Sequence, residues 1–134
     1  MNDNKRKAGI LLGVSSLPSR FGIGDFGENA YRFLDLLSEA GFSLWQILPL
    51  APLGYGHSPY QPFSSFAMDE LYLDLDQLSA EGLIEKAPDF HALDPKIAYE
   101  EIRAFKAPYL RKAYRAEMKK NPSLLEDFCL AHPW

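Results

Sequence analysis

Two short apolar runs on either side of an amphipathic stretch constrain the fold of this chain more than any other feature. Gly9 to Val14 and Ser43 to Leu48 are each the length of a strand and are almost continuously apolar, which is typical of strands buried on both faces of a parallel sheet. Between them, apolar residues recur at helical spacing before a stop at Gly41: Ala30, Phe33, Leu34, Leu37 and Ala40. The pattern predicts a helix over Gly27–Ala40 and two parallel strands joined by a right-handed crossover.

Two carboxylates stand at the start of the predicted helix. Asp25 and Glu28 have the spacing of a capping box, in which side chains accept hydrogen bonds from the first free amides of a helix. Paired carboxylates also carry out glycoside cleavage. The spacing favours the capping role.

Gly22, Gly24 and Gly27 spell the G-x-G-x-x-G pattern of dinucleotide-binding folds. Several residues, including Pro18, separate the glycines from the preceding strand, and the next strand does not end on an acidic residue. We therefore favour glycines that shape a loop over a nucleotide site.

The second half of the chain is mostly helical in its pattern. Leu71–Leu75 alternates apolar and polar residues and predicts a short strand, after which Asp76 is expected to cap a brief helix that ends at Gly82. A longer apolar stripe predicts a helix over Ile97–Lys119. Pro108 lies inside it and is expected to kink or divide it, because proline removes an amide donor and clashes with the preceding turn.

A last helix is predicted to begin at a second capping box, formed by Ser123 and Glu126. Cys129 lies on this helix, where a lone cysteine is most often a small core residue. The sequence ends abruptly at Trp134, and we expect the chain to be a truncated piece of something longer.

Charge and composition exclude several classes of partner. The net charge is −4, whereas nucleic-acid binding needs a clustered basic face. No apolar run is long enough to span a membrane, and the chain has no disulfide or metal pattern, since its candidate ligands are dispersed: His57, His91, His132 and Cys129. We expect a soluble, cytoplasmic protein with no metal and no cofactor; nothing indicates an oligomeric state.

The long segment from Pro49 to about Glu70 is rich in proline, glycine and aromatic residues. Loops of this length are usually functional or disordered, and the low charge favours a packed, functional loop. Within it, Gly54–Gln61 combines tight-turn glycines with tyrosine rings and polar groups, which suit the apolar faces and polar rims of sugars. An equally acceptable interpretation is that three aromatic residues simply pack the loop onto the scaffold: Tyr60, Phe63 and Phe66.

Several longer motifs in the first half resemble a known family. They are Gly9-Ile-Leu-Leu, Ser16-Leu-Pro, Phe21-Gly-Ile-Gly-Asp-Phe-Gly, Trp45-Gln-Ile-Leu-Pro-Leu, Gly54-Tyr-Gly-His-Ser-Pro-Tyr-Gln and Phe63-Ser-Ser-Phe. In order and spacing they are similar to the opening of 4-alpha-glucanotransferases of the amylomaltase (disproportionating enzyme) type. The resemblance implies an α/β fold: residues 1–75 would form the first two βα units of a catalytic (β/α)₈ TIM barrel, and residues 76–134 part of a helical insertion subdomain, truncated at its C-terminus.

The resemblance also implies a reaction. The family transfers α-1,4-glucan segments between maltooligosaccharides by a retaining double displacement that needs a carboxylate nucleophile and a carboxylic acid. In the family these groups come from later barrel strands, so no catalytic residue is assigned here and the chain alone is expected to be inactive. Tyr60 would stack on a donor-site sugar, Ser58 would line the same site, and Tyr55 would belong to an aromatic patch that contacts glucan farther away.

Three places depart from the usual residues of the family. Gly13 stands where many members have His, His57 stands where Asp is common, and Met68-Asp69 stands where Gly-Asn is frequent. A reading from another class is a stand-alone carbohydrate-binding module, without catalysis, that uses the Tyr55–Gln61 loop. Because two parallel strands cannot close a barrel, we also expect exposed apolar surface beside them.

Overall fold

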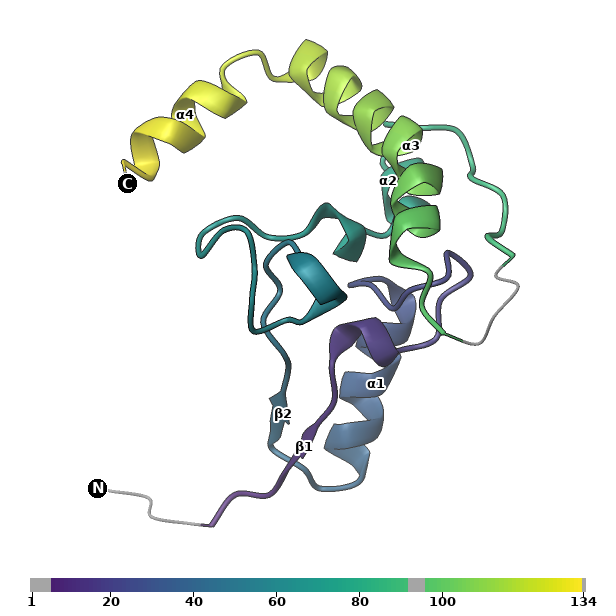
Figure 1. Ribbon diagram of the computed structural model, residues 1–134, viewed down its shortest axis with the longest axis vertical. Coiled ribbons are helices and arrows are strands. Elements are labelled where there is room, and N and C mark those ends of the chain that lie inside the picture. Colours follow the sequence, from purple (N-terminus) through teal and green to yellow (C-terminus); the bar gives the residue numbers. More distant parts are fainter. Residues whose placement is uncertain (1–5, 92–95, 134) are drawn as a thin grey trace.

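The computed structural model describes residues 6–91 and 96–133. Its first part is the predicted strand–helix–strand unit, formed by β1 (Gly9–Leu11), α1 (Glu28–Glu39) and β2 (Leu44–Gln46). The strands pair in parallel with Ile10 opposite Trp45, and α1 lies alongside them (Figure 1). The predicted parallel pairing and the helix between the strands are confirmed. The first strand is shorter than predicted because the chain turns into a 3₁₀ helix, η1 (Val14–Ser16).

The strand pair is covered on one face and open on the other. The Trp45 ring packs edge-on against Phe33 of α1 with centroids 5.0 Å apart, and its Nε1 donates to the Leu12 carbonyl at 2.8 Å. Leu11 and Leu44 point the other way and are 60% and 52% exposed. Burial of both strand faces is therefore not observed within the described residues, whereas the expectation of exposed apolar surface beside the strands is confirmed.

The predicted capping box at the start of α1 is wrong. The N-cap is Gly27, with no side-chain cap, and Asp25 is buried, where it accepts hydrogen bonds from the Gly27 amide and the Ser19 hydroxyl, both at 3.1 Å. A Cβ on Gly27 would lie 2.1 Å from Oδ2 of Asp74. The Asp25 carboxylate thus organises the first loop, while Gly27 allows the close approach of Asp74. Gly41 ends the helix as predicted, with φ at +79°.

Residues 71–75 do not form the predicted strand. Leu71 and Tyr72 belong to a 3₁₀ turn, η3 (Glu70–Tyr72), and Leu75 begins α2 (Leu75–Ala80), whose N-cap is Asp74 rather than Asp76. The side chain of Asp69 accepts from the Leu71 amide at 3.0 Å, and that of Asp74 accepts from the Asp76 amide at 2.9 Å. These local side-chain bonds to the backbone compete with strand pairing, which explains the error.

The longest helix is α3 (Tyr99–Lys120), and it runs through Pro108 without dividing. Apolar residues on both sides of the proline pack into the core, as the stripe predicted: Ile102, Phe105, Tyr109 and Ala113. Packing on both sides holds the two halves as one helix, while the proline itself is exposed. The chain then arcs into α4 (Leu124–Ala131), as Figure 1 shows.

Two expectations for α4 are corrected. Ser123 is at the N-cap position, but its hydroxyl donates to the carboxylate of Asp127 at 2.9 Å and makes no cap bond. Cys129 is exposed rather than in the core. Both follow from the position of α4, which has no buried residue and keeps Leu124, Phe128 and other apolar side chains partly open to solvent.

Lys106 of α3 is fully buried. Its Nζ donates to the carbonyls of Leu71 and Leu73, each at 2.7 Å, so that the helix is joined to η3 and the residue after it. Burial lowers the pKa of Lys106, and the negative charge of Asp25 opposes this shift. Burial in turn raises the pKa of Asp25, and Lys106 opposes that shift. The two groups therefore compensate each other in a water-poor environment.

Replacing this buried lysine should be costly. Lys106→Met leaves two carbonyls and Asp25 without their cation, and we expect it to lower the free energy of unfolding by about 3 kcal/mol. Lys112→Met is the matched control, because Lys112 lies on the same helix and pairs at the surface with Glu85; its expected loss is below about 0.5 kcal/mol. Urea unfolding of both variants checks this, and equal losses would contradict it.

The same lysine predicts a pH dependence. Because its pKa is lowered from the ordinary value of 10.5, the unfolded chain binds more protons than the folded chain just below that pH. Wild-type stability should therefore gain relative to Lys106→Met as pH rises through this window. Urea unfolding of both proteins at several pH values from neutral to alkaline measures the difference in their free energies of unfolding. If this difference stays constant or shrinks as pH rises, the pKa of Lys106 is not lower in the folded chain than in the unfolded chain.

Candidate functional site

The carboxyl ends of β1 and β2 lead into the two loops that the sequence singled out, and a small cavity lies between them. It measures about 90 Å³ and is lined by residues from both loops, the η3 turn and the start of α3: Gly13, Val14, Ser15, Leu48, Leu53, His57, Pro59, Tyr72 and Tyr99. Ligands of parallel α/β folds bind at this end of the strands. The geometry therefore makes this edge the candidate site.

Tyr72 forms one polar wall of the cavity. Burial raises the pKa of its phenol, and a hydrogen bond with the side chain of Ser15 opposes the shift. The phenol is therefore neutral at ordinary pH, so it can donate a hydrogen bond as well as accept one. This residue was not singled out from the sequence, because the segment around it was taken for a strand with no role in the site.

The segment from Leu53 to Pro62, which we call the site loop, is held together by its own backbone. Its two ends form an antiparallel bridge, and the Phe63 amide donates to the Pro52 carbonyl at 3.1 Å. At its tip, η2 (Tyr55–His57) makes a turn in which the His57 amide donates to Gly54 at 3.2 Å. The segment is thus a compact loop with close ends, a type that is frequently functional.

His57 connects the tip of the site loop to the helical half. Its ring stacks on that of Tyr99, with centroids 4.9 Å apart and planes 11° from parallel. Nε2 lies 3.4 Å from a carboxylate oxygen of Glu100. Sequence analysis identified His57 as a departure from the family pattern and as one of several dispersed histidines, without a role in the site. It missed Tyr99, since no motif or spacing relates residues 42 positions apart.

The three predicted binding residues come from this one loop. Ser58 is half-buried, and its hydroxyl accepts from the Tyr60 amide at 3.4 Å. Tyr60 is 73% exposed. The side chain of Tyr55 lies outside what the structure describes. The interpretation that aromatic residues pack this loop onto the scaffold is wrong for Tyr60, Phe63 and Phe66, since all three are more than 70% exposed.

The glycines of the G-x-G-x-x-G pattern serve close chain packing, as favoured from the sequence. A Cβ at Gly24 would lie 2.0 Å from the Val14 carbonyl, and one at Gly22 would lie 2.5 Å from the Phe90 ring. The Gly27 amide at the start of α1, where a phosphate would bind, already donates to Asp25. The local geometry therefore favours packing over a nucleotide site.

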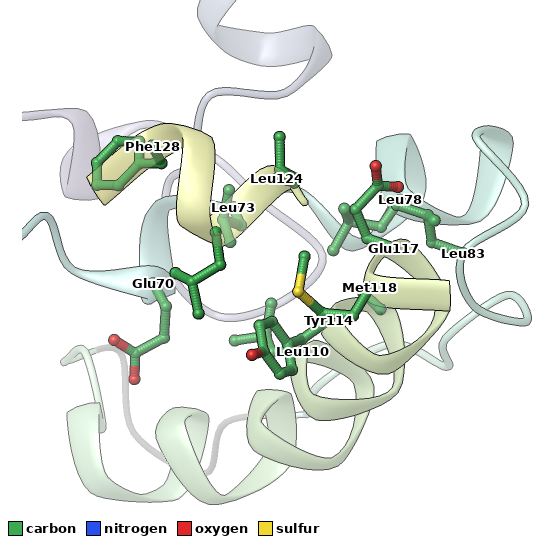
Figure 2. Close-up of a pocket in the computed structure, with 12 residues that line it drawn as sticks. Glu70, Leu73, Leu78, Leu83, Leu110, Tyr114, Glu117, Met118, Leu124 and Phe128 are labelled. Carbon is green, nitrogen blue, oxygen red and sulfur yellow. The ribbon is translucent and has the colours of Figure 1, made fainter. Parts of the chain in front are cut away.

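A larger hollow of about 560 Å³ lies between α2, α3 and α4, away from the strand ends. Figure 2 shows its mostly apolar lining, which includes Leu110, Met118, Leu124 and Phe128. Recognition of a hydroxyl-rich ligand needs several convergent polar groups, and here Glu70 and Glu117 are the charged members of the lining. Size alone does not make this groove the functional site.

Within residues 6–91 and 96–133, no three residues among His, Cys, Asp and Glu gather as a metal site would require. None of the helices there combines the length and the apolar character needed to cross a bilayer.

The neck of the site loop provides a test of its geometry. A Cβ at Gly54 would lie 2.2 Å from the Gln61 carbonyl, so Gly54→Ala should destabilise the protein by about 2 kcal/mol and speed amide exchange at Phe63. In the control Gly56→Ala the new methyl group meets no atom within 4 Å, and only the positive φ of +76° is strained, at about 1 kcal/mol. Phe63 exchange should stay slow in that variant. Equal exchange in the two variants would contradict the described neck.

Known proteins resemble this chain in sequence and in fold. The family model described as 4-alpha-glucanotransferase matches residues 12–134. The 4-alpha-glucanotransferases of Synechocystis sp. and Aquifex aeolicus are 42% and 45% identical, each over 96% of this chain and 27% of the relative. The structure of amylomaltase from Streptococcus agalactiae in complex with acarbose aligns with a TM-score of 0.88 at 38% identity, over 97% of this chain and 28% of that one. The chain thus spans about 27% of the length of these curated relatives, and it belongs to the 4-alpha-glucanotransferase family.

Proposed function

We propose that this chain is the glucan-binding first part of an amylomaltase-type 4-alpha-glucanotransferase. Residues 1–75 would supply the first two βα units of the (β/α)₈ barrel, and residues 76–134 part of its helical insertion. The observation that carries the proposal is the site loop at the carboxyl end of β2, in which the exposed Tyr60 directly follows Pro59 of the cavity wall. The face of the strand pair that is open here would be covered in the complete sheet of a longer protein, because parallel sheets are buried on both faces.

The site loop suits a sugar chain chemically. A pyranose ring presents C–H groups on its faces and hydroxyls on its rim, so an exposed tyrosine with hydroxyl groups nearby can bind both parts. Tyr60 offers its ring, and Ser58 offers a hydroxyl that accepts from the Tyr60 amide. Tyr55 would belong to an aromatic patch that contacts glucan beyond this site. The ligand would be an α-1,4-glucan or maltooligosaccharide.

Catalysis would need groups from elsewhere in a longer polypeptide. A retaining transfer uses two carboxyl groups about 5–5.5 Å apart, and no carboxylate lines the 90 Å³ cavity. The buried carboxylates are engaged in the fold: Asp25 accepts from Ser19 and Gly27, while Asp69 pairs with Arg103. The comparisons give no support to a stand-alone binding module, since the relatives described above are all named as transferases.

Glucan binding by this chain is directly measurable. Tyr60→Ala should weaken the binding of maltohexaose about tenfold, because it removes the stacking face, whereas Tyr60→Phe should stay within about threefold of wild type. NMR titration of the wild type and both variants determines the dissociation constants. An alanine variant that binds as tightly as wild type would remove Tyr60 from the site.

Activity gives a separate test. The 134-residue chain should not convert maltotriose into glucose and longer oligosaccharides, because the cavity lacks a carboxylate pair. Product analysis by chromatography checks this. Turnover that persists after rigorous purification would show that the chain holds its own catalytic groups.

A further inference from the structure

The site loop is organised internally by short-range bonds. The His57 amide donates to the Gly54 carbonyl and the Gln61 amide donates to the Ser58 carbonyl. The Tyr60 amide donates to the Ser58 hydroxyl. Bonds of this kind set the shape of the tip but not its position relative to the rest of the molecule. A contact across the fold must supply that position.

Tyr99 offers a rigid surface for such a contact. It is the first residue of α3, and its side chain packs against a buried cluster formed by Ile23, Leu71 and Ile102. The His57 ring lies nearly flat on it, at 4.9 Å and 11°. Glu100, the next residue of α3, adds an approach of 3.4 Å to the same imidazole, although its exposure makes that pair weak.

The backbone of His57 supports the same conclusion. Its φ is +55°, in the left-handed region that non-glycine residues rarely adopt. Gly56 beside it also has positive φ, at +76°. A strained residue persists only where its surroundings compensate for it, and such residues concentrate at functional sites. Here the stack on Tyr99 is the compensating contact.

We propose that His57 is a positioning residue, whose stack on Tyr99 fixes the tip of the site loop against α3 and thereby sets where Ser58 and Tyr60 meet the glucan. The inference rests on the proposed function for its ligand. The restraint of the loop does not depend on the proposed function, because the stack should hold the loop whether or not a sugar binds. The same ring lines the cavity together with Pro59 and Tyr99, so its loss would also open that wall.

The experiment compares His57→Ala, His57→Phe and Tyr99→Leu with His91→Ala, an exposed histidine outside the site. Exchange of the backbone amides of His57, Ser58, Tyr60 and Gln61 measures the restraint, and NMR titration with maltohexaose measures binding. His57→Ala should speed exchange there about tenfold and weaken binding by a similar factor, with the melting temperature nearly unchanged. His57→Phe, which keeps a stacking ring, should restore both, and His91→Ala should change neither.

Double substitution tests the pair. If the two rings act together, adding Tyr99→Leu to His57→Ala should have little further effect on exchange or binding. Should Tyr99→Leu fail to fold, the His57 variants decide, since that side chain is 46% exposed and its loss leaves the core intact. Unchanged amide exchange in His57→Ala would show that the stack on Tyr99 does not fix the tip of the site loop. Faster exchange with undiminished glucan binding would overturn its positioning role.

The two proposals fail in different ways. If wild type binds no maltohexaose while His57→Ala still loosens the loop, the stack on Tyr99 does fix the loop tip and the proposed glucan function is wrong. If wild type binds and His57→Ala matches it in both measurements, the glucan function stands and the positioning role is wrong.

Discussion

The ammonium group of Lys106 lies where three distant parts of the chain meet. From α3 it donates hydrogen bonds to the carbonyls of Leu71 and Leu73. Its positive charge also offsets the negative charge of the buried Asp25 carboxylate in the loop after β1. A buried charge is tolerated only when its hydrogen bonds and counter-charge are in place. The loop, the η3 turn and α3 must therefore assemble together, and the other tertiary contacts of the site follow from that arrangement.

This assembly explains why residues from both halves of the sequence pack together in the same buried clusters. One buried cluster combines Phe21 of the first loop with Leu75, Leu83 and Ala113 of the helical half, and another combines Ile23 with Leu71 and Ile102. Arg103 adds a pair with the buried Asp69. The helical half is thus packed onto the strand-end loops, and it carries Tyr99 into the wall of the cavity. A site at the strand ends depends on a helix that begins more than 50 residues after β2.

The elements that local sequence determines were predicted well. Apolar periodicity and the glycine stop placed α1, and the two apolar runs placed β1 and β2 and their parallel pairing. The two errors at helix starts share one cause. Asp25 and Ser123 have the spacing of capping residues, yet their side chains bond to Ser19 and Asp127 instead, because a polar side chain binds whichever partner the folded chain brings near.

For the candidate site, the sequence by itself determined the loop, its composition and its family, since these rest on contiguous residues. Ser58 and Tyr60 were predicted as binding residues in that way. Only the tertiary structure decided that Tyr72 and Tyr99 line the same cavity, that Tyr60 is exposed, and that His57 stacks on Tyr99. The physical reason is range: turn and helix preferences act over a few residues, whereas a cavity wall is formed by side chains that meet only after α3 packs against the loops.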